Sequence, residues 1–207
     1  YDLAQLIHQQ ELAPVTIIAH SLGGSVALRY AGVYPENVKK MVVIEGTGGP
    51  PAELEQRPVH ERMREWIDHT RKASGRQPKR YDTLEDAYTR MHEANSHLRE
   101  DQARHLTIHG SNQNEDGSYS WKFDNYTHVM NPFGVNREQS RELWSRIDKP
   151  VLLVSGSESW FAQESREDPL PYFQNAQQVQ INDAGHWLHH DQLDEFLMIT
   201  REFLASA

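Results

Sequence analysis

The chain has 207 residues, of which 25% are charged, and its formal net charge at pH 7 is -9. This length is enough for one sizeable core, or for a core with an inserted subdomain. Because an acidic chain is not attracted to nucleic-acid backbones or anionic membranes, we expect no nucleic acid and no membrane as a partner, and a small-molecule substrate instead.

The first fifty residues predict an α/β arrangement. Residues 2–10 have the apolar spacing of a short helix, and an uninterrupted apolar strand is predicted over 15–19. Ser21 follows, and small and apolar residues at helical spacing then continue to Gly32. A second apolar strand is predicted over 41–45. Continuously apolar strands are typical of a mostly parallel sheet that helices cover on both faces.

The middle of the chain has a different character. Residues 50–147 combine dense charge and several prolines with helical patterns, and no buried strand is predicted there. We interpret this segment as a mainly helical cap with a return loop, inserted between two segments of the core. The predicted organisation is therefore a first core segment over 1–49, the cap over 50–147 and a second core segment over 148–207.

Strand patterns resume in the last sixty residues. Strands are predicted over 149–156 and 178–181, with a helix beginning near Pro169 between them. A turn over 183–187 carries a histidine, and an amphipathic helix over 191–205 ends the chain.

Ser21 stands where a nucleophile would be expected. It lies between a predicted strand and a predicted helix, with small neighbours that permit a sharp bend. The backbone N–H of Leu22, at the start of that helix, is the candidate oxyanion donor. A serine hydroxyl is a poor nucleophile at neutral pH, so acyl transfer also requires a base and an acid that orients the base.

Two motifs carry a resemblance to a known family. The segment Ala19-His20-Ser21-Leu22-Gly23-Gly24 resembles the nucleophile elbow of the α/β-hydrolase superfamily, with alanine where glycine is common. Asp183-Ala184-Gly185-His186-Trp187 is similar to the histidine loop of that family. The resemblance implies the carboxyl-terminal two-thirds of the fold, with His186 as the general base and His20 as a scaffold residue.

The acid of the triad is less well defined. The family usually places it three residues after the glycine that ends the strand at Gly156, but that position holds Ser159, which cannot balance an imidazolium charge. Some members place the acid at the end of the preceding strand, which here is Glu45. We therefore rank Glu45 first, Glu158 second and Asp183 a distant third.

Other site types are not expected. His189, His190 and Asp191 are adjacent in sequence, and adjacent side chains seldom converge on one ion, so we predict no metal and no cofactor. The chain has no cysteine, which excludes disulfides. Residues 1–10 lack the pattern of a secretion signal, and we expect a soluble, cytoplasmic protein.

The beginning of the chain carries a further expectation. In the family, the second oxyanion N–H comes from a loop that would precede residue 1, and the strand over 15–19 would lie at an exposed sheet edge. We therefore expect this sequence to be the carboxyl-terminal portion of a longer hydrolase. The alternative is a homodimer in which a second copy covers the edge.

The resemblance implies a serine hydrolase, since relatives that cleave haloalkanes or epoxides use aspartate at the elbow. A carboxylesterase acting on small, mostly apolar esters is the leading interpretation. The alternatives are a non-catalytic binding protein of the same fold, a C–C bond hydrolase, and a haloperoxidase-like activity on the same triad. Four aromatic residues are candidates for the substrate pocket: Trp66, Trp121, Phe123 and Trp160.

Overall fold

The computed structural model describes residues 1–48, 57–129, 134–160 and 168–206. The chain divides into two compact units. The first combines residues 1–55 with 135–207, and the second consists of residues 56–134.

The first unit is built on a four-stranded parallel sheet in the order β1-β2-β6-β7. The strands are β1 (Val15–His20), β2 (Val38–Ile44), β6 (Val151–Gly156) and β7 (Ala176–Ile181). They match the four strands predicted from the sequence, and the α/β fold class is confirmed. Because all four strands run in the same direction, their carboxyl ends lie along one edge of the sheet.

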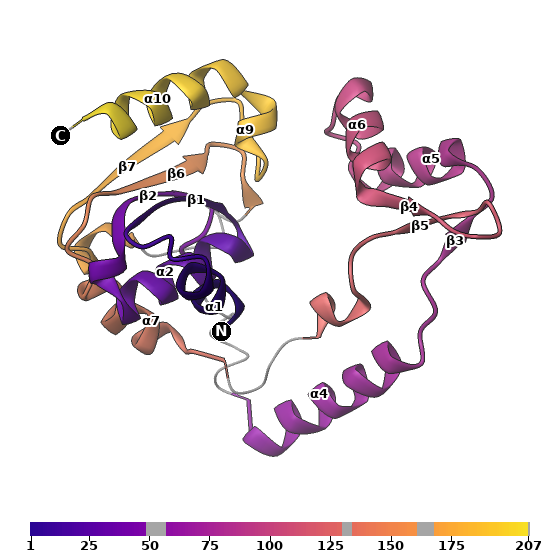
Figure 1. Cartoon of the computed structure of the whole chain (residues 1–207), viewed down its shortest axis with the longest axis horizontal. Helices are drawn as coiled ribbons and strands as arrows, with labels where there is room; N and C mark the ends of the chain where they lie inside the picture. Colours follow the sequence, from indigo (N-terminus) through magenta and orange to yellow (C-terminus); the bar gives the residue numbers. More distant parts are fainter. Residues whose placement is uncertain (49–56, 130–133, 161–167, 207) are drawn as a thin grey trace. The chain divides into compact units, whose positions relative to one another are not determined.

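Helices cover both faces of this sheet (Figure 1). One face carries α1 (Asp2–Gln9), α2 (Leu22–Val33) and α7 (Arg137–Ser145), and α10 (Leu193–Ala205) covers the other. Alternate residues of β2 therefore enter different cores: Met41 and Val43 pack with α1, α2 and α7, whereas Val42 and Ile44 pack with α10. This two-sided burial explains why the strand is apolar without interruption.

The second unit contains more strand than the sequence predicts. Its helices are α4 (Val59–Ser74), α5 (Leu84–Ala94) and α6 (Glu100–Gly110), followed by the short 3₁₀ helix η2 (Asn125–His128). A small antiparallel sheet, in the order β3-β5-β4, comprises β3 (Arg80–Tyr81), β5 (Tyr119–Trp121) and β4 (Ser111–Gln113). The Trp121 indole N–H donates to the Tyr81 hydroxyl at 3.2 Å and joins two of these strands.

The segment expected as the cap, residues 50–147, is longer than this second unit. Helix α7 belongs to the first unit because Trp144 and Ile147 are buried in the core beneath α2. The Arg146 side chain also donates to the carbonyl of Gly32, at the end of α2, at 2.7 Å. The other expected boundary, at residues 49 and 50, lies outside the described residues.

Three short elements complete the first unit. A 3₁₀ helix η1 (Pro35–Asn37) precedes β2. The helix expected near Pro169 is only the 3₁₀ turn η3 (Leu170–Tyr172), because Phe173 is already extended and β7 begins at Ala176. The helix expected over 191–205 corresponds to α10, which begins at Leu193. A separate short helix, α9 (Leu188–Asp191), precedes it, and the backbone leaves the helical region at Gln192 between them.

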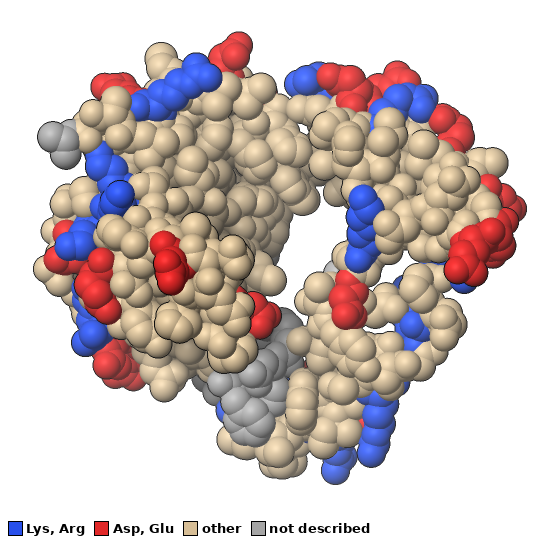
Figure 2. Space-filling model, in the orientation of Figure 1, with Lys and Arg blue, Asp and Glu red and all other residues tan. Residues whose placement is uncertain are grey.

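Charged residues of both signs are mixed on the surface. On the face drawn in Figure 2, Lys and Arg side chains lie among Asp and Glu side chains on both units. In the described ranges, every helix is too short or too polar to cross a lipid bilayer.

Candidate active site

Ser21 occupies a sharp turn between β1 and α2. Its backbone dihedrals are φ 54° and ψ -122°, a combination that residues other than glycine rarely adopt. The Ser21 N–H donates to the carbonyl of Ile44, the last residue of β2, at 2.8 Å. This bond continues the β1–β2 ladder by one residue and fixes Ser21 at the carboxyl end of the sheet. Strained residues of this kind cluster at functional sites, where the surrounding structure holds them in place.

The turn depends on close packing of α2 against the end of β2. A Cβ atom added to Gly24 would lie 2.8 Å from the Cα atom of Gly46 and 3.1 Å from a methyl group of Val43. Gly23, one residue earlier, has no heavy atom within 4 Å of the corresponding position. The neighbouring glycines of the motif therefore have different roles.

We expect Gly24→Ala to lower the free energy of unfolding by about 1–3 kcal/mol, because the methyl group would be forced against the Gly46 backbone. Gly23→Ala is the matched control and is expected to be neutral or slightly stabilising, since alanine is favoured over glycine in a helix. Urea denaturation of both variants measures the difference. Equal effects of the two substitutions would contradict this account of the turn.

His186 lies beside the Ser21 hydroxyl. Its Nε2 atom is 2.9 Å from Ser21 Oγ, and the residue is 6% exposed. Three contacts hold the loop between β7 and α9 that carries it. The Gly185 N–H donates to Asp191 Oδ2 at 2.9 Å, the Asp183 N–H donates to Ser157 Oγ at 3.0 Å, and His20 Nε2 lies 2.8 Å from the His186 carbonyl. Because a carbonyl oxygen only accepts, His20 Nε2 is the donor in the last contact.

Glu45 is buried on the other side of the His186 ring. It follows β2 directly, with φ 53°, and its Oε2 atom lies 3.6 Å from His186 Nδ1. Gly156 N–H donates to Oε1 at 2.6 Å, and the Ser159 hydroxyl donates to Oε2 at 2.7 Å. A buried carboxylate beside Nδ1 favours the tautomer that carries its proton there, which leaves Nε2 able to accept from Ser21.

The other acid candidates are placed differently. Glu158 is exposed, and its backbone N–H donates to the carbonyl of Ala184. Asp183 is also exposed, with φ 52°. Ser159, which sequence reasoning set aside as unable to act as the acid, is fully buried against Glu45. The contact between Ser159 and Glu45 forms because β2 and β6 are neighbouring strands, which brings Glu45 to the turn after β6. Only a prediction of the strand order could have revealed it from the sequence.

Burial shifts the titration of the site residues. Removal from water disfavours charge, so it lowers the pKa of His186 below its usual 6.5 and raises the pKa of Glu45 above its usual 4.5. Hydrogen bonds from Ser159 and Gly156 to Glu45 act against the second shift. The pKa of His20 is also lowered, mainly by burial.

Apolar side chains border Ser21 and His186. Leu22, the first residue of α2, is 70% exposed, and Trp160 is 54% exposed with its ring centroid 5.0 Å from that of His186. Trp187 makes an edge contact with His186, with a centroid separation of 5.3 Å. The other candidate pocket aromatics, Trp66, Trp121 and Phe123, belong to the second unit.

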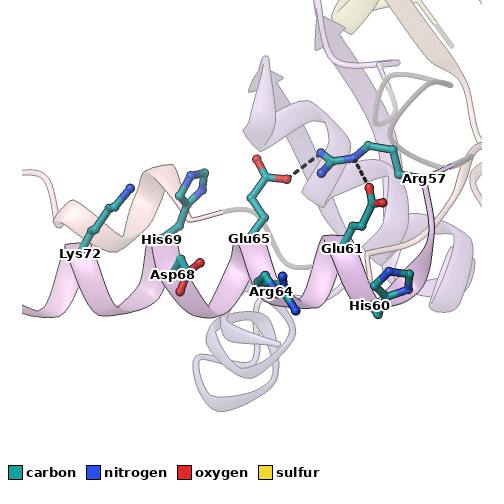
Figure 3. A pocket seen from close by; sticks show the side chains of 8 residues that line it. All are labelled: Arg57, His60, Glu61, Arg64, Glu65, Asp68, His69 and Lys72. Carbon is teal, nitrogen blue, oxygen red and sulfur yellow. Dashed lines mark hydrogen bonds and ion pairs between the residues drawn. The ribbon is translucent and has the colours of Figure 1, made fainter.

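Helix α4 borders a hollow of about 550 Å³ that is chemically different (Figure 3). Arg57 Nη1 is 2.7 Å from Glu65 Oε2, and Arg57 Nε is 3.7 Å from Glu61 Oε2. All the lining residues are charged or histidine: Arg57, His60, Glu61, Arg64, Glu65, Asp68, His69 and Lys72. The residues that line this hollow include no hydroxyl or thiol that could act as a nucleophile. We therefore take Ser21 and His186, and not the hollow beside α4, as the candidate active site.

The histidine-rich segment after the loop has structural contacts. Asp191 accepts from Gly185, and the His189 ring packs against His20 and Phe196. Burial, with smaller contributions from neighbouring histidines, lowers the pKa of His189 to about 4. Within the described ranges of the chain, no three His, Asp or Glu side chains are grouped so that they could hold a metal ion.

Comparison with known proteins gives consistent results. The family model described as "alpha/beta hydrolase fold" matches residues 2–193. A zebrafish (Danio rerio) serine hydrolase-like protein is 25% identical over 162 residues, covering 77% of this chain and 49% of the relative. Esterase YbfF of Escherichia coli K12 is 24% identical over 223 residues, covering 98% of this chain and 72% of the relative.

The solved structures agree at the level of the fold. The Mycobacterium tuberculosis esterase Rv0045c superposes with a TM-score of 0.75 at 20% identity, covering 99% of this chain and 67% of that one. The chain thus spans about half of the zebrafish relative and about seven tenths of the bacterial one.

Proposed function

The chain belongs to the α/β-hydrolase fold family, and on that premise we propose that it is a serine hydrolase that cleaves small, mostly apolar carboxylic esters through an acyl-enzyme. One observation carries the proposal: His186 Nε2 lies 2.9 Å from Ser21 Oγ while its Nδ1 faces the buried Glu45 carboxylate. This is the geometry that nucleophilic catalysis by serine requires. Relatives named as a serine hydrolase-like protein and an esterase support the same reaction class.

In the first step, Ser21 Oγ attacks the ester carbonyl carbon and its proton passes to His186 Nε2. Glu45 stabilises the imidazolium that forms, and the Leu22 N–H at the start of α2 donates to the developing oxyanion. The C–O bond to the alcohol then breaks, and His186 returns the proton to the leaving oxygen. Water attacks the acyl-enzyme by the reverse sequence, releasing the acid and restoring Ser21.

The apolar border of the site supports the substrate class. Leu22, which follows Ser21 in the chain, and Trp160, which packs beside His186, both present exposed apolar surface. Such surface gains binding free energy from an alkyl or aromatic group and none from a charged one. The serine at position 159 favours the alternative of a non-catalytic binding protein. The Glu45 carboxylate, which faces His186 from another strand, supports the enzyme instead.

A fluorophosphonate probe tests the proposal directly, because it forms a covalent adduct only with an activated serine. We expect one adduct on the folded protein, and peptide mass spectrometry should locate it at Ser21. The variant Ser21→Ala is expected to give none. A folded protein that remains unlabelled would favour the binding-protein alternative.

The pH dependence of kcat/KM should reflect the shifted pKa values of His186 and Glu45. Catalysis requires neutral His186, and burial lowers its pKa, so protonation of His186 should limit kcat/KM only below pH 6.5. Catalysis also requires ionised Glu45, whose pKa is raised above 4.5. As the solution is acidified, activity should therefore be lost with a midpoint above pH 4.5. An acid limb centred below pH 4.5 in the kcat/KM profile would contradict this expectation.

A further inference from the structure

Ser159 is a buried hydroxyl that the mechanism above does not use. It is 0% exposed, in the turn that follows β6, and its hydroxyl donates to Glu45 Oε2 at 2.7 Å. The same oxygen faces His186 Nδ1 at 3.6 Å. Ser159 therefore contacts the atom of the carboxylate that is directed at the imidazole.

The second oxygen of Glu45 is held from the same turn. The Gly156 N–H donates to Oε1 at 2.6 Å, so donors from the end of β6 contact both oxygens of a carboxylate that comes from β2. Two donors on different oxygens fix the plane of a carboxylate, whereas one would allow it to rotate. The register supports this arrangement, because Ile44 pairs with Val154, the Glu45 N–H donates to the Val154 carbonyl at 2.9 Å, and β6 continues past this point to Gly156.

A carboxylate removed from water is stable as an anion only where donors replace the lost hydration. Among the described residues, two titratable groups act on Glu45: His186, whose Nδ1 lies 3.6 Å from Oε2, and His20, which lowers the pKa of Glu45 when it is protonated. Neither histidine is held in the charged form, since burial lowers both of their pKa values. The neutral donors are therefore needed to keep Glu45 ionised.

We propose that Ser159 is a positioning residue, which orients the Glu45 carboxylate toward His186 and keeps it ionised. The proposal rests on the proposed function for its effect on turnover. It also assigns a role to position 159, where the family usually has the acid of the triad. Here Ser159 donates a hydrogen bond to Glu45, the acid that the neighbouring strand supplies.

Hydrolysis of p-nitrophenyl butyrate tests the proposal in four variants: Ser159→Ala, Glu45→Gln, the double variant, and Ser140→Ala. Hydrogen bonds to charged groups are strong, so Ser159→Ala is expected to reduce kcat by about tenfold to hundredfold with little change in KM. Its acid limb should move to higher pH, because Glu45 loses a donor that favours its ionised form. Ser140 is the matched control, a buried serine of α7 whose hydroxyl donates to the carbonyl of Asn136.

The double variant separates positioning from general stability. If Ser159 acts through the Glu45 carboxylate, Ser159→Ala should cost less than about twofold once Glu45 is already glutamine. An equal loss in both backgrounds, with an unchanged acid limb, would overturn the proposal. Should the alanine variant fold poorly, Ser159→Thr keeps the hydroxyl and should retain the wild-type pH profile, and a shifted profile in that variant would also overturn it.

A second measurement does not depend on activity. The side-chain carboxyl carbon of Glu45, followed by ¹³C NMR, should titrate at a higher pH in Ser159→Ala than in the wild type and be unchanged in Ser140→Ala. An unchanged midpoint in Ser159→Ala would contradict the proposal. If the wild type hydrolyses no ester, the proposed function fails, and this titration still decides whether Ser159 controls Glu45.

Discussion

Replacement of Ser21 by alanine is expected to lower kcat for ester hydrolysis by about 10⁶-fold, the loss typical of removing the nucleophile from a serine hydrolase. The residual rate would come from binding and the oxyanion donor alone. His186→Ala should lose a similar amount, because Nε2 is the atom 2.9 Å from Ser21 Oγ that takes the proton. Turnover of p-nitrophenyl butyrate in single and double variants measures both effects.

The losses should not add. Nucleophile and base act as one unit, so the double variant is expected to be about as slow as either single variant. Ser25→Ala is a suitable control, since this serine lies one turn further along α2 and its hydroxyl donates to the Gly46 carbonyl at 2.9 Å. That variant should keep most of its activity. A large residual rate in Ser21→Ala would exclude Ser21 as the nucleophile.

Glu45→Gln is expected to reduce kcat by about 10³- to 10⁴-fold, because an amide beside Nδ1 neither stabilises the imidazolium nor enforces the required tautomer. The substitution preserves the size of the side chain, so the fold should be retained. Comparison of kcat for this variant and the wild type, with circular dichroism as a check on folding, measures the effect.

Glu158→Gln provides the matched control for this experiment. Glu158 is the neighbouring carboxylate that the sequence also suggested, but it is exposed on the turn after β6. Its replacement should change kcat by less than about twofold, as is usual for exposed positions away from a reacting group. A large loss in Glu158→Gln together with a small loss in Glu45→Gln would reverse the assignment.

Much of the first unit could be predicted because its signals are local. The apolar runs at 15–19 and 41–45 correspond to β1 and β2, and the small residues beside Ser21 permit its turn. Both cores bury β2, whereas β1 packs with one core only and Ile18 on its other face is 52% exposed, so the expected burial on both faces is wrong for β1. The resemblance implied the α/β-hydrolase fold, with Ser21 and His186 acting together although they are 165 positions apart in the sequence. It also made Glu45 a candidate, since the ends of adjacent parallel strands meet.

The elements that were missed depend on tertiary contacts. The sequence of an amphipathic helix such as α7 does not specify which unit the helix packs against. The burial of Trp144 beneath α2 shows that α7 belongs to the first unit. The strands β3 and β4 are two and three residues long, too short for an alternating pattern. Ser159 is separated from Glu45 by 114 positions, so its contact with Oε2 follows from strand pairing and from no nearby sequence signal.

The pairing of β2 with β6 has a consequence for how this protein can vary. The chain leaves the first sheet after Ile44, at the carboxyl end of β2, and re-enters it at Val151, which pairs with Met41 at the start of the β2–β6 ladder. Because β2 and β6 are parallel, the connection must cross from the carboxyl edge of the sheet back to its amino edge. Beyond the length that this crossover needs, additional residues have little influence on closing the sheet. Each doubling of a flexible loop costs only about 0.6 kcal/mol. Insertions, deletions or exchange within the second unit should therefore leave the framework of Ser21, Glu45 and His186 in place.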